Sequence, residues 1–263
     1  MEFEKLYGTN CRITKIENGD VLPIGGSFYG KFDLKLEADI DAFETFFEKT
    51  AKNADVLVDN QGMAEWLKSC KTDFEPAVFA ELYAFNGVLS KMYPDCSAEL
   101  GKRQQFYTPE RNARLSEAFE NKVCACAELA VLAQAYLQTR GFDSRYFGGE
   151  LLYSENDEFG EAHCFVAFEH NGKNYIFDPA NPIKSGGHVL PRIAEVTVGK
   201  ARLEQFERRI HPEDGDTSRK CAFLETEDIL TKSKWFYGCG DSANIYPSFI
   251  IKQGAVKNES RCR

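Results

Sequence analysis

Residues 122–142, KVCACAELAVLAQAYLQTRGF, constrain the fold of this chain more than any other segment. Apolar side chains recur in it at a spacing of three and four residues, which places them on one face of a helix. They are Leu129, Leu132, Ala133, Tyr136 and Leu137. Gly141 follows, at the position where glycine commonly ends a helix. The segment therefore predicts a helix from about Cys124 to Thr139 that buries one face against the rest of the protein.

Three strands are predicted after this helix, in SRYFGGELLY and HCFVAFEHNGKNYIFD. Asn171-Gly172 is a strong two-residue hairpin turn between the last two strands. A turn there places position 163 opposite 180 and position 165 opposite 178. His163 and Asp178 then become diagonal neighbours on one face, within reach of each other, whereas His170 points to the other face.

Cys126 is the partner that we expect for this pair. It lies three residues before Leu129, on the face that the helix buries, and at a helix start the backbone N–H groups lower a thiol pKa. A neighbouring imidazolium would lower it further, with Asp178 orienting the ring of His163. The same N–H groups could stabilise an oxyanion. Cys124 lies roughly 200° around the helix from Cys126 and should face away.

The same residues resemble a known family. The motif C-x-E-x-A-x-L spans Cys126–Leu132, and it is followed by Gly141, Arg145 and Gly149; His163 then opens a strand, and Asp178-Pro179 comes fifteen residues after it. This pattern, over residues 122–181, resembles the core of the transglutaminase-like superfamily. The resemblance implies an α+β, papain-like fold in which a nucleophile helix packs on an antiparallel sheet. It also implies a catalytic triad of Cys126, His163 and Asp178.

Several positions depart from the family pattern. Cys124 stands in place of the usual glycine, and other residues replace two tryptophans and a glutamate: Phe165, Asn174 and Ala167. The family places an oxyanion donor upstream of the nucleophile, and the candidates here are Gln104 and Gln105. We interpret Glu128 as a first-turn carboxylate favoured by the helix dipole.

We expect three regions: a mostly helical N-terminal lobe over 1–100, a transglutaminase-like core over 101–200, and a C-terminal extension over 201–263 packed on the core. The lobe should begin with a hairpin at Asn18-Gly19 and contain helices near 61–70 and 76–91. Residues 104–109 are interpreted as a connection. A strand–helix–strand segment is expected within 220–238.

Charge, hydropathy and cysteine content limit the kinds of partner and the cellular compartment that we expect. The formal charge is −9, and basic residues alternate with acidic ones, so we expect no nucleic-acid partner. The longest apolar stretch, Leu129–Leu137, is too short to span a bilayer, and MEFEKLYG is not a signal peptide, so we expect no membrane and a cytoplasmic location. The nine cysteines are scattered and contain no CxxC pair, which favours reduced thiols.

We expect no cofactor and no metal. Cys124, Cys126, His163 and Asp178 are all residue types that zinc accepts, but the two cysteines should diverge on the helix. For the same reason we disfavour a redox sensor that joins them.

The favoured function is thiol-dependent acyl transfer on an amide of a protein or peptide, as in a cysteine peptidase, amidase or deamidase. Hydrolysis is preferred because water needs no dedicated acceptor tunnel. Two alternatives remain: a protein-crosslinking transglutaminase, and an inactive papain-like module that binds proteins.

Overall fold

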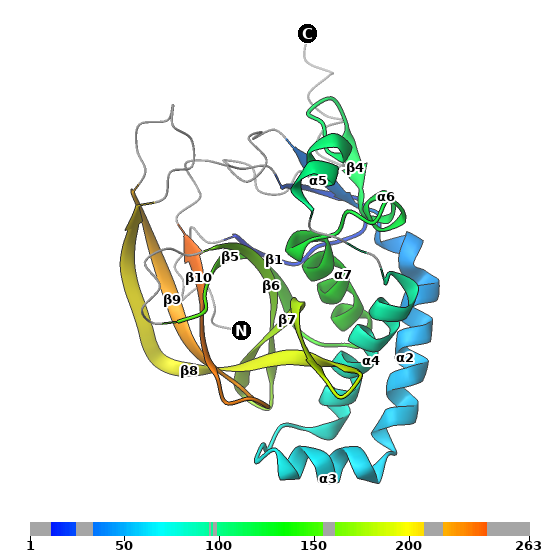
Figure 1. Ribbon diagram of the computed structural model, residues 1–263, viewed down its shortest axis with the longest axis vertical. Helices are drawn as coiled ribbons and strands as arrows, with labels where there is room; N and C mark the ends of the chain where they lie inside the picture. Colours follow the sequence, from blue (N-terminus) through cyan, green and yellow to red (C-terminus); the bar gives the residue numbers. More distant parts are fainter. Residues whose placement is uncertain are drawn as a thin grey trace.

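A closed ring of strands forms one half of the molecule, and helices cover one side of it (Figure 1). The computed structural model describes residues 12–24, 34–94, 96, 99–154, 161–207 and 218–240. Within these residues the fold is mixed, with helices concentrated before residue 140 and long strands after it.

The ring is a six-stranded antiparallel barrel in the order β5-β10-β9-β8-β7-β6, closed by pairing of β6 with β5. Its strands are β5 (Ser144–Leu152), β6 (Glu161–His170), β7 (Lys173–Ser185), β8 (His188–Glu207), β9 (Ser218–Asp228) and β10 (Lys234–Gly240). A short strand, β1 (Arg12–Thr14), pairs with β5 outside the ring. The described residues of the expected C-terminal extension thus share one sheet with those of the expected core.

The helices form a layer against β5, β6 and β7, with α7 in direct contact with all three strands. They are η1 (Ile40–Phe43), α2 (Glu44–Val58), α3 (Gln61–Ser69), α4 (Pro76–Met92), α5 (Leu100–Phe106), α6 (Leu115–Glu120) and α7 (Cys126–Thr139). A small second sheet joins β2 (Asp20–Pro23), β3 (Lys35–Ala38) and β4 (Asn112–Arg114). The packing of α7 on an antiparallel sheet agrees with the sequence prediction. No described helix combines the length and the apolar character needed to cross a bilayer.

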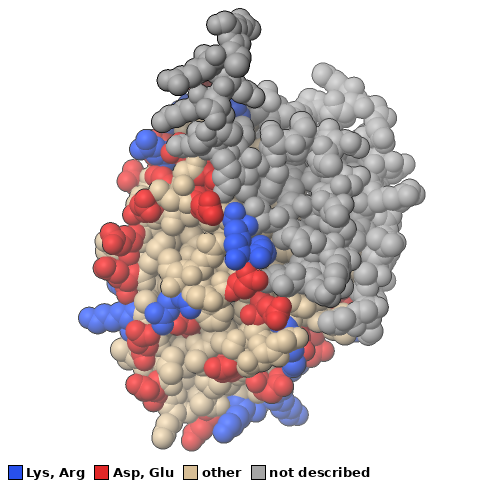
Figure 2. Space-filling view, turned by 180° about the vertical axis from the view of Figure 1, so that it is seen from behind, with Lys and Arg blue, Asp and Glu red and all other residues tan. Residues whose placement is uncertain are grey.

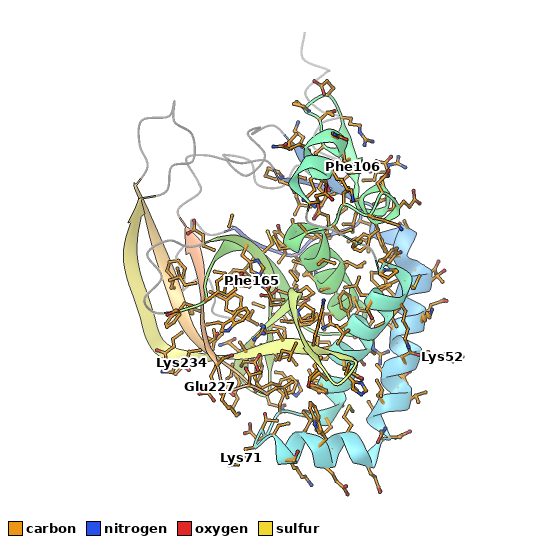
Figure 3. All side chains as sticks on the ribbon, viewed as in Figure 1. Lys52, Lys71, Phe106, Phe165, Glu227 and Lys234 are labelled. Atoms are coloured by element: carbon orange, nitrogen blue, oxygen red, sulfur yellow. The ribbon has the colours of Figure 1, made fainter. Side chains whose placement is uncertain are left out.

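Alternating side chains of β6 enter two separate cores, as expected for a strand buried on both faces. Phe165 and Ala167 belong to the core inside the barrel, and Figure 3 shows Phe165 within the ring of strands. Val166 and Phe168 belong to the larger core between the barrel and the helices. The face that a residue of β6 occupies therefore decides whether it meets the barrel interior or α7.

Three local predictions are wrong. Asn18-Gly19 forms a turn, with Gly19 at φ 83°, but the strands on its two sides pair with β5 and β3 instead of with each other. Residues 220–238 form strand, turn and strand with no helix. Helix α5 extends into the expected connection at 104–109. In the first case distant pairing partners overrode the local pattern, because strand preference depends on context. In the second case β9 and β10 pair with each other across a short turn that leaves no room for a helix.

Two glycines allow close contacts of β10 with its neighbours, Gly149 on the side of β5 and Gly238 on the side of Phe223 in β9. A Cβ atom on Gly149 would lie 2.0 Å from the carbonyl oxygen of Gly238, and a Cβ atom on Gly238 would lie 2.5 Å from the ring of Phe223. Neither position has room for a side chain. Glycine at both positions is what the observed spacing of these strands requires.

We predict that Gly149→Ala lowers the free energy of unfolding by at least about 2 kcal/mol, because the new methyl group collides with backbone that cannot move away. Gly87→Ala is the control, since a Cβ there meets nothing within 4 Å. In helix α4 it should instead raise stability by about 0.5 to 1 kcal/mol. Urea denaturation of both variants tests this, and equal stability of Gly149→Ala and wild type would contradict it.

Candidate active site

The β6–β7 hairpin has the register expected from the sequence as far as Val166, but the expected pairings of 163 with 180 and of 165 with 178 do not form. The strands pair from His170–Lys173 to Val166–Phe177, around a turn in which Asn171 and Gly172 have φ of 52° and 74°. Beyond Val166 the strands separate, and Asp178 pairs with Arg192 of β8 instead. The side chains of His163 and Asp178 still meet: Nε2 of the imidazole lies 2.8 Å from Oδ2 of the carboxylate.

Asp178 is fully buried and accepts hydrogen bonds at both oxygens. The backbone N–H of Ala180 donates to Oδ1 at 3.2 Å. Oδ2 accepts from the side-chain amide of Asn181 at 3.0 Å and from the hydroxyl of Tyr237 at 3.0 Å, in addition to His163. A buried carboxylate needs such partners, because an unpaired charge in the interior is costly.

His163 and Asp178 each stabilise the charged form of the other. Burial alone would lower the pKa of His163, but the charge and hydrogen bond of Asp178, followed by Cys126, outweigh it and raise this pKa to about 10. Burial alone would raise the pKa of Asp178, but His163, Asn181 and Tyr237 lower it overall. At neutral pH the site therefore holds an imidazolium beside a carboxylate.

Cys126 is the first residue of α7 and reaches the imidazole from the helix layer. Its half-buried side chain hydrogen-bonds to His163. Asp178 occupies Nε2 of the ring, so Nδ1 is the nitrogen available to the thiol. Where β6 and β7 separate, the edge of β6 at His163 is no longer covered by β7, and a group at the tip of α7 can reach it.

A buried ion pair fixes the start of α7. Glu128 accepts the backbone N–H of Ala125 at 2.8 Å, and its two oxygens bind the guanidinium of Arg103 at 2.8 and 3.1 Å. Tyr107 also donates to Glu128, and Arg103 donates to the carbonyl of Val123. The first-turn role expected for Glu128 is present, and the contact with Arg103 ties α5 to the residues around Cys126.

A second thiol, Cys164, lies against Cys126. The two cysteines hydrogen-bond, and the hydroxyl of Tyr146 donates to the sulfur of Cys164 at 3.0 Å. The contact with Cys164, together with burial, raises the pKa of Cys126 well above its ordinary value, although His163 acts to lower it. His163 and Cys164 thus have opposite effects on the thiolate of Cys126.

The other expected residues lie as follows. Cys124 is buried and hydrogen-bonds to Cys96 in the helix layer, so it faces away from Cys126 as predicted. Gln104 is half-buried and Gln105 is exposed on α5; their role as oxyanion donors stays a prediction. Among the described residues, no cluster of three or more histidine, cysteine or acidic side chains could hold a metal ion.

Sequence reasoning missed three residues of the site. Cys164 is adjacent to His163 in the sequence, and Asn181 follows Asp178 by three residues, so both could have been considered from position alone. Tyr237 comes from β10, and its contact with Asp178 depends on the closure of the barrel. No pattern in the sequence near residue 237 indicates that contact.

A scan against protein-family models found no match to this chain, and a search of curated proteins found none either.

We predict that Arg103→Met destabilises the protein by about 3 to 5 kcal/mol, because it leaves the charge of Glu128 buried without its partner. Lys102→Met is the matched control: it removes the adjacent charge, which is exposed and pairs with Glu99 at the surface. That change should alter stability by less than about 0.5 kcal/mol. Thermal and urea unfolding of both variants give the comparison, and similar effects would show that the buried pair has no special role.

A second prediction concerns the reactivity of Cys126. Cys164→Ala removes the largest cause that raises the pKa of Cys126, so the rate of its alkylation by iodoacetamide should reach half-maximum at a lower pH than in wild type. Cys96→Ala removes a partner of Cys124 and should leave this midpoint unchanged. Mass spectrometry of the peptide that contains residue 126 measures the rate. An unchanged midpoint in Cys164→Ala would rule out the opposing role of Cys164.

Proposed function

We propose that this protein catalyses thiol-dependent acyl transfer on an amide through Cys126, His163 and Asp178. One observation carries the proposal: a thiol at a helix start contacts an imidazole that is hydrogen-bonded to a buried carboxylate. Nucleophile, base and orienting acid in this order are the arrangement that activates a thiol.

The first half of the reaction forms a thioester. The thiolate form of Cys126, which His163 favours and Cys164 with burial disfavours, forms when the thiol loses its proton to water. It attacks the carbonyl carbon of the amide, and the oxyanion of the tetrahedral intermediate faces the N–H groups at the start of α7. His163, as imidazolium, gives its proton to the amide nitrogen while the carbon–nitrogen bond breaks. The amine leaves, and Cys126 carries the acyl group.

The second half releases the acyl group. Neutral His163 takes a proton from water while the water oxygen attacks the thioester carbonyl. The carbon–sulfur bond then breaks, giving a carboxylic acid and returning Cys126 to thiolate and His163 to imidazolium. Asp178 keeps the ring in place and stabilises its charge in both halves. With a lysine amine in place of water, the same steps would crosslink two proteins.

The family assignment belongs to the same proposal. The motif from Cys126 to Asp178 resembles the transglutaminase-like superfamily, and the packing of α7 on the antiparallel strands β5, β6 and β7 supports this assignment. The closed barrel, which includes β9 and β10, surrounds this core with strands that the motif does not cover.

The substrate that we propose is a protein or a peptide. On the part of the surface described in Figure 2, acidic and basic side chains are interspersed, and the net charge of −9 disfavours nucleic acid. Five cysteines are free thiols, which fits a reducing compartment, and we propose the cytoplasm; they are Cys70, Cys96, Cys124, Cys126 and Cys164.

A second candidate function is a protein-binding module that has lost the chemistry. The observation that favours it is the contact of Cys126 with Cys164, since this contact and burial disfavour the thiolate. The residues that differ from the family pattern at 165, 167 and 174 point in the same direction. In this case a thiol-directed electrophile would label Cys126 no faster than a thiol of ordinary reactivity.

The test is turnover of a panel of peptides and proteins, read by mass spectrometry. Backbone scission identifies a peptidase, a gain of about 1 Da a deamidase, and a loss of about 17 Da a crosslinking or cyclising enzyme. We expect Cys126→Ala and His163→Ala to abolish the reaction while circular dichroism shows a retained fold. Cys70→Ala and His170→Ala are the controls and should keep full activity, because neither residue contacts the site. Full turnover by Cys126→Ala would refute the proposal.

A further inference from the structure

Three hydrogen-bond donors converge on one oxygen of Asp178. Nε2 of His163 lies 2.8 Å from Oδ2, and the Tyr237 hydroxyl and the Asn181 amide each lie 3.0 Å from it. The other oxygen, Oδ1, accepts the N–H of Ala180 at 3.2 Å. The negative charge that faces His163 is therefore shared with two further donors, which compete for the same lone pairs.

Tyr237 is held in this position from the far side of the barrel. It is fully buried, its ring packs edge-on against Phe165 at 4.9 Å, and it stacks on Trp235 at 6.2 Å. Burial, followed by the charge of Asp178, raises the pKa of Tyr237 well above its ordinary value, so the phenol keeps its proton and remains a donor. A buried phenol hydroxyl usually has a hydrogen-bond partner, and the partner of Tyr237 is the carboxylate of Asp178.

Asn181 is held by a second set of contacts. Its backbone carbonyl accepts a hydrogen bond from Nε of Arg192 at 2.9 Å. The guanidinium of Arg192 lies 3.7 Å above the ring of Trp235 and 3.3 Å from Asp228. Both donors to Asp178 are thus connected to the β9–β10 hairpin, one directly and one through Arg192.

We propose that Tyr237, assisted by Asn181, is a positioning residue that holds Oδ2 of Asp178 against His163 and limits how strongly that oxygen binds the imidazolium. The proposal rests on the acyl transfer proposed above, because positioning has a catalytic purpose only if His163 serves Cys126. Strand β10 then has two roles. It closes the barrel, and it supplies the Tyr237 hydroxyl, which shares the negative charge of Asp178 with the imidazolium of His163.

Tyr237→Phe removes one donor while the ring contacts remain. The Asp178 carboxylate then loses a hydrogen bond that favours its charged form, so its pKa should rise by about half to one unit. Oδ2 should also bind the Nε2 proton of His163 more strongly, which moves the NMR resonance of that proton downfield. A purely structural role for Tyr237 would move neither quantity.

The experiment uses the full chain labelled with ¹⁵N-histidine. The resonance of the proton on Nε2 of His163 is identified by its loss in His163→Ala, and it is followed as the pH falls. In Tyr237→Phe we expect this resonance further downfield. As the pH falls, it should disappear at a pH about half to one unit higher than in the wild type, because Asp178 becomes protonated at a higher pH. The acid limb of Cys126 alkylation by iodoacetamide should shift in the same direction.

Tyr175→Phe is the matched control. Tyr175 lies three residues before Asp178 on β7 and belongs to the core on the helix side, away from the barrel interior. Its loss should leave the His163 resonance and the alkylation profile unchanged. If Tyr237→Phe fails to fold, Asn181→Ala makes the test through the acid limb of Cys126 alkylation, because it removes the other donor to Oδ2. The His163 resonance is not used for this variant, since the Asn181 amide also lies 3.4 Å from Nε2.

The outcomes separate this proposal from the proposed function. A His163 resonance that is absent in wild type, or identical in wild type and in Tyr237→Phe, overturns the positioning role even if the enzyme turns over substrate. If the resonance shifts in Tyr237→Phe but the wild type turns over no substrate, acyl transfer is refuted. The sharing of Oδ2 of Asp178 between Tyr237 and His163 is then still supported. A shift of equal size in Tyr175→Phe would also overturn the proposal, since the effect would then not depend on Oδ2.

Discussion

The hydrogen bond between His163 and Asp178 is the interaction on which the rest of the site depends. This hydrogen bond exists because the turn at Asn171-Gly172 sets the register of β6 and β7. The two strands pair only from Val166 to His170, and His163 lies in the part of β6 that precedes Val166 and is not paired with β7. A shift of one residue in this register would turn His163 to the opposite face of the sheet. The imidazole would then face the helix layer, and Asp178 would lose the cation that balances its buried charge.

The His163–Asp178 pair is contacted from two sides, by Cys126 from the helix layer and by Tyr237 from inside the barrel. The buried Arg103–Glu128 ion pair fixes the start of α7, which presents Cys126 to the imidazole. From inside the barrel, Tyr237 reaches the carboxylate. Gly149 allows the close approach of β5 to β10, the strand that carries Tyr237. Gly149 lies directly opposite His163 on β5, so barrel closure and the position of the imidazole depend on the same part of the sheet.

The parts of the fold that depend on local pattern could be predicted from the sequence. Helix α7 follows from the apolar spacing after Cys126, and the His163–Asp178 contact follows from a two-residue turn and the alternation of side chains along a strand. The barrel could not be predicted, because its closure pairs β10 with β5 across more than eighty residues and no local pattern specifies such a partner. For the same reason no sequence pattern indicates the role of Tyr237. Asn18-Gly19 has the pattern of a hairpin turn, but the strands that flank it have distant partners.

In the mechanism that we propose, the carboxylate of Asp178 acts through His163 on the sulfur of Cys126. The most direct measurement is the rate of Cys126 alkylation by iodoacetamide at neutral pH in Asp178→Asn, which keeps the shape of the side chain and removes its charge. If the three residues act as a unit, the imidazolium is lost, the pKa of the thiol rises by at least one unit, and the rate falls about tenfold or more. A rate equal to that of the wild type would show that the thiol and the buried pair are neighbours without a common function.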